Sequence, residues 1–384
     1  MIIEIPRKVN TIISQLNASG FDAFIVGGCV RDSILGRVPG DWDVTTQAKP
    51  YDIKKIFRPT IDTGIEHGTV TVLIQGEPFE VTTYRLDGDY SDKRHPDKVE
   101  FTNDLREDLL RRDFTINAMA YSDKTGIIDE FEGMKDLDAK IIRCVGNPDE
   151  RFDEDALRIL RAIRFAAQLG FEIEQDTYDA IARHASDLQY VSKERILVEL
   201  TKTLESAHPE KIRLLWDLGI VPYISENFGL IKKSDAPRSW AELMKDLNSD
   251  EVYLILKELK ADNETVRCAQ VIAEEYKNDI DPSEVGVRKL LMKIGPELYD
   301  LLIDIKKRST KDPDGIIEKA QRTKEGIFAR GDCYSLKQLA VSGADLIAAG
   351  YKQGPELGAK LAELLDAVIA TPQLNTKEKL MKLI

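Results

Sequence analysis

The spacing of hydrophobic positions predicts alternating helices and strands in the first part of the chain. Residues 5–16 have helical spacing, residues 21–26 predict a short buried strand, and residues 31–35 predict a helix directly after two glycines. Two β-rich runs, at 69–73 and 79–84, flank a turn sequence and predict a hairpin. We therefore predict an α+β domain built on a small mixed β-sheet with helices.

Beyond residue 151 the strand pattern nearly disappears and amphipathic helical spacing replaces it. The stretches with this spacing are 156–169, 177–185, 193–204, 211–218, 252–259 and 285–291. Breaks that contain Pro with Gly, Asn, His or Asp lie at 146–148, 207–209 and 311–315. We expect this part to be all helical, and the length of 384 residues predicts several domains.

The composition excludes several classes of protein. No stretch approaches about eighteen consecutive apolar residues, and the N-terminal residues lack the pattern of a signal peptide, so we expect a cytoplasmic protein without a membrane span. The four cysteines (Cys29, Cys144, Cys268 and Cys333) show no CxxC spacing, which argues against disulfides or structural zinc. The four histidines are scattered, without a His-Asp pair, so histidine-based phosphohydrolase chemistry is not expected.

The formal net charge of −13 is unusual for a protein that binds nucleic acid, because phosphate contacts require Lys and Arg. The charge is unevenly distributed, since residues 301–384 contain fourteen Lys and Arg against eleven Asp and Glu. This modestly basic end fits an RNA contact, and a solvated helical surface explains it equally well.

Asp41 and Asp43 are the first candidates for chemistry. Residues two apart on an extended strand project from the same face, so both carboxylates can reach one cation. Paired oxygen donors suit Mg²⁺, which keeps several waters and takes phosphate oxygens as its other ligands. A DxD pair alone is more often an acidic turn. Glu80 is a candidate for a third carboxylate, and a strand-edge surface acid is an equally good interpretation.

Gly27 and Gly28 join a predicted strand to a helix, thirteen residues before the acidic pair. The amides of this loop, together with Arg31, suit the phosphates of a nucleoside triphosphate. The loop is not a Walker A motif, because no Lys-Ser or Lys-Thr follows in register. A plain turn is the ordinary interpretation, and the nearby Asp41 and Asp43 reverse it. With two metal ions, one activates a 3′-hydroxyl and the other neutralises the phosphates and the leaving pyrophosphate.

Arg112 and Asp113 precede an apolar segment within residues 109–120. A functional interpretation gives Arg112 a phosphate or ribose and Asp113 a ribose hydroxyl. By residue type alone, Asp113 is equally well a helix N-cap.

The run 152–165 places arginines at every third position behind acidic residues. Helical geometry predicts Asp155, Arg158, Arg161 and Arg164 on adjoining turns, and a salt-bridged surface is the ordinary interpretation. Cytosine and adenine both present an exocyclic amine beside an acceptor nitrogen, so Asp155 can accept while Arg158 donates. Guanine and uracil reverse that pattern. Because an unmatched buried charge is costly, this pair can admit CTP and ATP while rejecting GTP and UTP.

The motifs GGCVRD, DWD, RRDFTINAM and EDALRILRAIRF, in this order and spacing, resemble the class II tRNA nucleotidyltransferases of the polymerase β and poly(A) polymerase superfamily. The resemblance implies an α+β nucleotidyltransferase head followed by an all-α neck, body and tail in an elongated multi-domain protein. We expect the catalytic head at 1–146, a neck for nucleobase selection at 147–208, the body at 209–310, and a tRNA-binding tail at 311–384.

The resemblance also implies roles for individual residues. It assigns metal and catalytic roles to Asp41 and Asp43, and nucleotide-binding roles to Gly28, Arg31, Arg112, Asp113, Asp155, Arg158, Arg161 and Arg164. Glu154 matches a supporting acid, and no role is transferred to Glu80. The implied partners are the tRNA 3′ end, CTP and ATP, with Mg²⁺ as the cofactor and no protein partner evident.

Family members add CCA, only CC, or only A, and a separate branch makes poly(A) tails. The polar run 85–98 resembles a flexible loop that CC-adding enzymes lack, which leaves template-independent CCA addition and A addition; we expect CCA addition, because it is the commoner activity in the family. A non-catalytic RNA-binding relative is a further alternative, and intact Asp41 and Asp43 argue against it. The glycine-containing run 341–358 resembles a tail region that holds the tRNA elbow, although helix-ending glycines explain it equally well.

Overall fold

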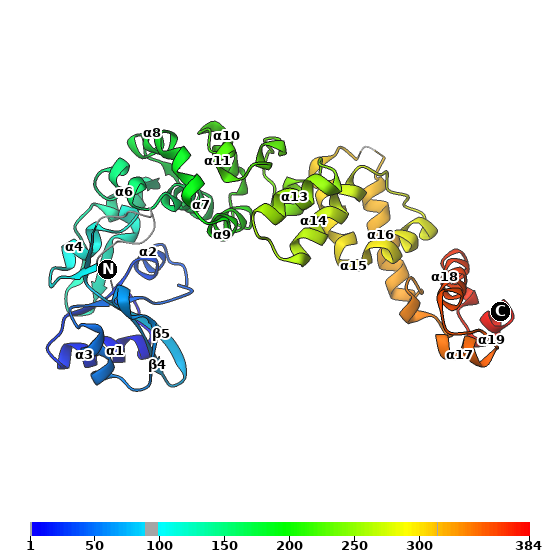
Figure 1. Ribbon diagram of the computed structural model, residues 1–384, viewed down its shortest axis with the longest axis horizontal. Coiled ribbons are helices and arrows are strands. Elements are labelled where there is room, and N and C mark those ends of the chain that lie inside the picture. Colours follow the sequence, from blue (N-terminus) through cyan, green and yellow to red (C-terminus); the bar gives the residue numbers. More distant parts are fainter. Residues whose placement is uncertain (1, 89–98, 313) are drawn as a thin grey trace. The chain divides into compact units, whose positions relative to one another are not determined.

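The computed structural model describes residues 2–88, 99–312 and 314–384 (Figure 1). The chain divides into two compact units. Unit 1 comprises Met1–Ser239 and Ile255–Ala261, and unit 2 comprises Trp240–Leu254 and Asp262–Ile384. The finer division into four domains stays a prediction.

A mixed sheet forms the centre of the N-terminal part of unit 1. Its seven strands, among the described residues, have the order β3-β4-β5-β2-β1-β8-β9. Neighbours are antiparallel except β2 and β5, which run parallel. The strands are β1 (Ala23–Val26), β2 (Val44–Thr46), β3 (Thr60–Gly64), β4 (Thr69–Ile74), β5 (Glu77–Thr83), β8 (Met119–Ser122) and β9 (Gly126–Asp129). The predicted mixed sheet is confirmed.

The predicted hairpin is formed by β4 and β5, whose last pair is Ile74 with Glu77. The two turn residues, Gln75 and Gly76, both have positive φ, at 53° and 82°. This conformation matches the turn to the right-handed twist of the strands. Two further strands, β6 (Arg85–Asp87) and β7 (Val99–Phe101), pair antiparallel. Most of the predicted flexible loop, residues 89–98, lies outside the described residues.

Helices around the sheet bury one face each. Helix α1 (Arg7–Ala18) buries Val9, Ile12, Ile13 and Leu16, which recur at helical spacing. The other helices of this part are α2 (Gly28–Ile34), α3 (Pro50–Ile56), α4 (Leu105–Leu110) and α5 (Gly133–Ala139), with the 3₁₀ turns η1 (Ile65–His67) and η2 (Thr115–Asn117). Helix α2 begins directly at the second glycine, three residues earlier than predicted.

The rest of unit 1 is helical, apart from the short parallel pair β10 (Ile141–Ile142) and β11 (Glu172–Ile173). Helix α7 (Leu157–Leu169) is buried along most of its length. It contacts α6 (Pro148–Glu154), α9 (Lys193–Leu204) and the 3₁₀ turn η4 (Pro209–Arg213). The other helices of this part are α8 (Gln175–His184), α10 (Leu214–Asp217) and α11 (Val221–Ile224), with the 3₁₀ turns η3 (Ala185–Tyr190) and η5 (Phe228–Leu230). The predicted change from mixed to helical structure is confirmed.

Unit 2 is helical throughout its described residues. Its helices are α12 (Trp240–Leu243), α14 (Asn263–Tyr276), α15 (Glu284–Ser309), α16 (Ile316–Arg330), α17 (Gly343–Ala348), α18 (Pro355–Ala370) and α19 (Lys377–Met381), with η6 (Leu336–Gln338) and η7 (Pro372–Leu374). Helix α13 (Ser249–Glu258) contributes residues to both units. Helix α15 is kinked at Gly295, which precedes Pro296 and has φ 79°.

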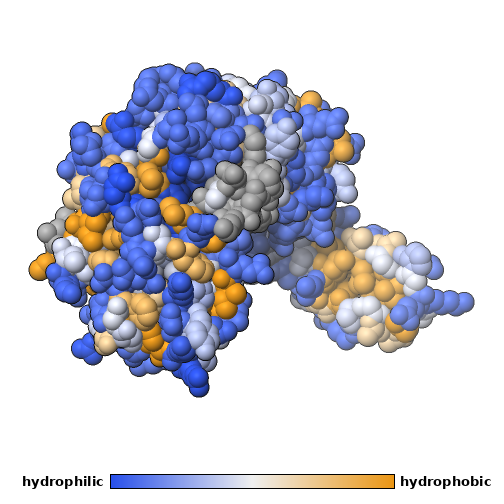
Figure 2. Space-filling model, turned by 60° about the vertical axis from the view of Figure 1, so that its left-hand side comes forward, coloured by the Kyte–Doolittle hydropathy of each residue, from blue (hydrophilic) through white to orange (hydrophobic). Residues whose placement is uncertain are grey.

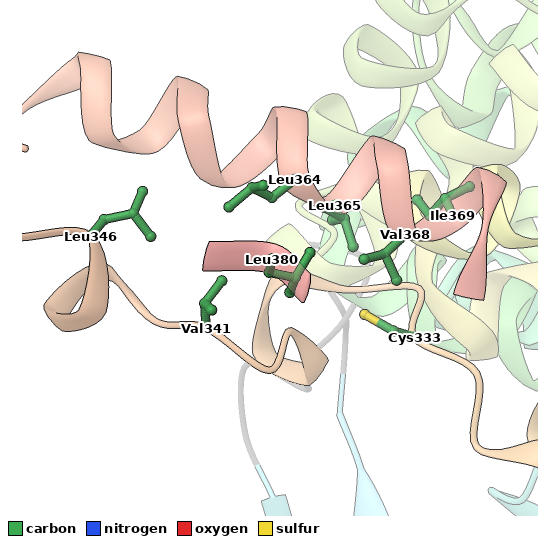
Figure 3. Close-up of a cluster of buried hydrophobic side chains, with 8 residues drawn as sticks. All are labelled: Cys333, Val341, Leu346, Leu364, Leu365, Val368, Ile369 and Leu380. Carbon is green, nitrogen blue, oxygen red and sulfur yellow. The ribbon is translucent and has the colours of Figure 1, made fainter. Parts of the chain in front are cut away.

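A small hydrophobic cluster holds the last helices of unit 2 together (Figure 3). Leu364, Leu365, Val368 and Ile369 of α18 face Val341, Leu346 of α17 and Leu380 of α19, and Cys333 completes the cluster. On the face seen in Figure 2 the exposed residues are mainly hydrophilic, and apolar residues gather in several groups, one of them on the lobe at the right of the view. Among the helices of the described part of the chain, we find none with the length and hydrophobicity needed to cross a bilayer.

Candidate functional site

Three carboxylates gather where β2 and β5 run side by side. Asp41 and Asp43 lie just before β2 rather than within a strand, and the backbone N–H of Val26 donates to the Asp43 carbonyl at 3.1 Å. The parallel register pairs Val44 with Val81, so Asp43 lies beside Glu80. The pKa of Asp43 is raised to about 6, mainly by burial. The negative charges of Asp41 and Glu80 also raise this pKa, and the positive charge of Arg112 lowers it. A cation would relieve this repulsion.

The donor set fits a metal that needs few protein ligands. Within the described residues, no three or more His, Cys, Asp or Glu side chains are arranged so that together they could hold a metal ion. A cation beside Asp41 and Asp43 would therefore take water and phosphate oxygens as its remaining ligands, which is the usual coordination of Mg²⁺. Glu80 lies close enough to Asp43 for its charge to raise the pKa of Asp43, and its role as a third metal ligand stays a prediction.

The two glycines of the loop after β1 differ in whether the surrounding structure needs a residue without a side chain. Gly27 has φ 81°, and a Cβ there would lie 3.1 Å from Nη1 of Arg112. The positive φ therefore favours glycine at position 27, and a larger residue would also be in tight contact with Arg112. A Cβ on Gly28 would meet only Nη2 of Arg31, at 3.7 Å, which is an ordinary contact. The protein's own packing does not require glycine at position 28.

Asp108, which the sequence analysis did not identify, holds the two arginines of the Arg-Arg-Asp motif. Its side chain is fully buried, and its Oδ1 accepts from Nε and Nη2 of Arg111 at 3.0 and 2.8 Å. Its Oδ2 accepts from Oγ1 of Thr45 at 3.1 Å and lies 3.4 Å from Nη2 of Arg112. Burial raises the pKa of Asp108, but Arg111 and Arg112 outweigh it, so the pKa is lowered. The spacing of Asp108 from both arginines was the available clue.

Arg112 keeps a free donor beside the glycine loop. Its Nε atom is buried and has no hydrogen-bond partner. A buried donor without a partner is costly, so such a group indicates a place where a ligand supplies the acceptor. The position of Arg112, next to Gly27 and close enough to Asp43 to lower its pKa, joins the loop to the acidic pair.

Asp113 connects α7 to the sheet domain. Its Oδ2 accepts from Nε and Nη2 of Arg161, at 2.8 and 2.5 Å, and its Oδ1 accepts from Nδ2 of Asn117 and the N–H of Phe114, at 3.1 and 2.8 Å. Burial raises the pKa of Asp113, but the charge of Arg161 and the hydrogen bond from Asn117 lower it to about 2. Because four donors occupy its two oxygens, the Asp113 carboxylate holds the side chains of Arg161 and Asn117 in place. Its predicted contact with ribose stays a prediction.

Three of the predicted arginines converge on one aromatic ring. The guanidinium carbons of Arg31, Arg161 and Arg164 lie 5.1, 5.4 and 4.1 Å from the centre of the Phe165 ring. Such distances allow cation–π attraction, which helps to hold like charges together. Arg31 also donates to Oδ1 of Asn117 at 2.6 Å, so it belongs to the same network as Asp113.

Arg164, like Arg31, is buried, and its partners belong to the helical part of unit 1. Its Nε donates to Oε2 of Glu199 at 2.5 Å and its Nη1 to the side chain of Gln168 at 3.0 Å. Burial lowers the pKa of Arg164 despite the charge of Glu199. Its predicted contact with the nucleotide stays a prediction.

The predicted helical alignment of Asp155 with the three arginines is wrong. Helix α6 ends at Glu154 and α7 begins at Leu157, and Asp155 between them is extended, with φ −144° and ψ 101°. Its Oδ1 accepts from the N–H of Leu157 at 3.1 Å, and its Oδ2 accepts from Nη2 of Arg195 at 2.8 Å.

Arg158 is held by different partners. It donates to Glu154 and to the carbonyl oxygens of Arg151 and Arg111, the last two at 2.9 and 3.0 Å. Glu154 thus supports Arg158, as the sequence resemblance implies. The carbonyl of Arg111 also places Arg158 next to the Arg-Arg-Asp motif.

A mixed sheet with a glycine loop and an acidic pair, followed by an arginine-bearing helix, defines a nucleotidyltransferase of the poly(A) polymerase type. Family models agree along the chain. The poly A polymerase head domain matches residues 23–143, the probable RNA and SrmB-binding site of polymerase A matches 170–228, and tRNA nucleotidyltransferase domain 2 (putative) matches 232–384.

Full-length relatives narrow this class. The chain is 37% identical to a CCA-adding enzyme of Ligilactobacillus salivarius, with 100% of this chain and 98% of the relative covered. It is 36% identical to that of Geobacillus kaustophilus, over 96% and 94%. The crystal structure of Bacillus stearothermophilus CCA-adding enzyme in complex with CTP aligns with a TM-score of 0.82 at 34% identity, over 98% and 96% of the two chains. The chain belongs to the CCA-adding enzyme family.

Proposed function

We propose that this protein adds C, C and A to the 3′ end of tRNA, using CTP and ATP without a nucleic-acid template and releasing pyrophosphate. Family membership along the whole chain supports this activity. The observation that carries the proposal is the convergence of the acidic pair, the Gly27–Gly28 loop and Arg112 at one place. A nucleoside triphosphate has the charge and size to contact all three.

Asp41 and Asp43 are the proposed metal ligands, and Glu80 is the nearest further carboxylate. Members of this family normally use a divalent metal ion, and we propose Mg²⁺ because oxygen donors predominate and few protein ligands are available. When bound, Mg²⁺ would activate the attacking hydroxyl and neutralise phosphate charge. The chain itself supplies two carboxylates whose repulsion favours a cation, as the raised pKa of Asp43 reflects.

Gly28, Arg31 and Arg112 are proposed to bind the nucleotide. No neighbouring atom packs tightly against Gly28, so its backbone is open to a close approach by the triphosphate. Arg112 offers its unpartnered Nε to a phosphate or ribose oxygen. Asp108 and Asp113 orient the charged groups around them, so fewer degrees of freedom are lost on binding.

Asp155 and Arg158 are proposed to read the base, with Arg161 and Arg164 as further contacts. Asp155 lies in the break before α7 and Arg158 in the first turn of α7, and both are fixed by other side chains, Asp155 by Arg195 and Arg158 by Glu154. A rigid acceptor and donor can reject bases whose edge reverses the pattern, because mismatched charged groups lose their partners on desolvation.

We also propose the division into head (1–146), neck (147–208), body (209–310) and tail (311–384), with tRNA bound by the tail, and a cytoplasmic location. The match of separate family models to 23–143 and 170–228 supports the boundary between head and neck, whereas the third model, at 232–384, begins inside the proposed body rather than at residue 209.

An extension assay tests the proposed function. The purified protein is given a tRNA that lacks its last three nucleotides, with CTP alone, ATP alone, or both. We expect two C residues with CTP alone and a complete CCA end with both. Addition of A only to a tRNA that already ends in CC identifies an A-adding enzyme, a long A tail identifies a poly(A) polymerase, and tRNA binding without incorporation identifies a non-catalytic relative.

A further inference from the structure

Helix α9 carries two side chains that contact residues proposed to select or bind the nucleotide. Arg195 contacts Asp155, and Glu199, one helical turn further along, contacts Arg164. Helices α7 and α9 lie side by side (Figure 1). Two residues with proposed nucleotide roles are therefore held by one neighbouring helix.

The contact between Arg195 and Asp155 fixes a carboxylate that the backbone alone does not fix. Asp155 lies in the extended break between α6 and α7, outside either helix. One of its oxygens is occupied by the N–H of Leu157 and the other by Nη2 of Arg195, at 3.1 and 2.8 Å. With one bond on each oxygen, the carboxylate has a single orientation and still has lone pairs for a further donor.

A second observation indicates a ligand next to Arg195. Its Nη1 atom is buried and has no hydrogen-bond partner, while the side chain as a whole is 25% exposed. A guanidinium with only a structural purpose normally has its buried donors satisfied, because an unmade hydrogen bond is costly. Nη1 is therefore a donor that is left for a water molecule or for an acceptor on a bound ligand.

We propose that Arg195 is a positioning residue for base selection. It holds the Asp155 carboxylate in the orientation that accepts the exocyclic amine of cytosine or adenine, and an acceptor on the bound nucleotide completes its Nη1. This inference rests on the proposed function, and it makes the contact of Arg195 with Asp155 a requirement for base selection.

The test compares three variants of the full-length protein. Arg195→Met removes every donor but keeps an unbranched apolar side chain, and Arg195→Lys keeps one charged donor for Asp155. Lys202→Met, on the exposed side of the same helix, is the matched control. Steady-state incorporation of CTP, UTP and GTP is measured separately on tRNA lacking CCA, and incorporation of ATP on tRNA that ends in CC, alongside thermal unfolding.

For Arg195→Met we expect kcat/KM with CTP and ATP to fall about 10- to 100-fold, mainly through KM, which is the loss expected for a charge-assisted hydrogen bond. Incorporation of UTP and GTP should fall less, so the preference for CTP and ATP over UTP and GTP becomes smaller. Arg195→Lys should recover part of that preference, and Lys202→Met should match the unmodified protein.

An unchanged ratio of CTP to UTP incorporation in Arg195→Met overturns the inference, and so does an equal loss with all four nucleotides. If Arg195→Met does not fold, Arg195→Gln replaces it and the same ratio decides. Failure of the proposed function is distinguishable, because the unmodified protein would then add no CCA at all.

Discussion

Nε and Nη2 of Arg161 both donate to one oxygen of Asp113, joining residues 48 positions apart in the chain. The bond connects helix α7 to the Arg-Arg-Asp motif of the sheet domain. Since Asn117 uses the other oxygen of Asp113 and also accepts from Arg31, the contact extends to the helix that follows the glycine loop. The phosphate side and the base side of the proposed site are thus held by one buried carboxylate.

Replacing Asp113 by Asn should destabilise the protein in a pH-dependent way. The pKa of Asp113 is lowered from 3.8 to about 2, so its contribution to stability is complete above about pH 4 and is lost as the pH falls towards 2. We expect Asp113→Asn to lower the free energy of unfolding by on the order of 2 kcal/mol near neutral pH, a discounted value because 33% of the Arg161 side chain is exposed.

Urea unfolding of both proteins between neutral pH and about pH 3 measures this effect. The difference should narrow on acidification, and Asp138→Asn, at an exposed position, should show little difference at any pH. A gap for Asp113→Asn that stays constant down to pH 3 would contradict the linkage.

Alanine at the two loop glycines should separate folding from binding. Gly27→Ala forces a positive φ on alanine and brings its Cβ to 3.1 Å from Arg112, so we expect a loss of about 1 to 3 kcal/mol in stability. Gly28→Ala meets only an ordinary contact and should fold normally. If the triphosphate approaches this backbone closely, KM for CTP should nevertheless rise in Gly28→Ala. Thermal unfolding and steady-state kinetics check the pair, and a normal KM in a stable Gly28→Ala would exclude that approach.

Asp41→Ala should abolish incorporation of both C and A, by about 10³-fold or more, because the proposed metal ligand is lost from every cycle. The protein should remain folded, since Asp41 is exposed. We expect Mg²⁺ with CTP to raise the melting temperature of the unmodified protein, and this rise should be smaller in Asp41→Ala. Loss of only one of the two nucleotides would argue against a shared metal site.

Arg158→Ala should loosen base choice more than it affects the metal-dependent step. It removes a buried donor held by Glu154 and two carbonyl groups, and we expect the preference for CTP over UTP to fall about tenfold or more. Arg183→Ala, on the exposed side of α8, is the control for removing an arginine. Incorporation of each nucleotide by itself is the measurement. An intact preference in Arg158→Ala would refute base reading by this residue.

Local patterns were sufficient for most elements of the fold. The hairpin of β4 and β5 followed from two β-rich runs around a turn, and the change to helices after residue 151 followed from a change of period. Local patterns predicted the wrong conformation for Asp155, because the helical spacing of residues 152–165 continues without an interruption in the sequence. The break between α6 and α7 is accompanied by contacts from Leu157 and the distant Arg195, which no local pattern contains.

By itself the sequence determined the type of each long element, the mixed sheet domain, the family, and the motifs in which charged and glycine residues are grouped. These depend on periodicity and on neighbours within a few positions. Only the tertiary structure decided that Glu80 lies beside Asp43, that Asp108 holds Arg111 and Arg112, and that Arg195 fixes Asp155. Pairing of charges depends on the register of strands and the packing of helices, which bring together residues that are far apart in the chain.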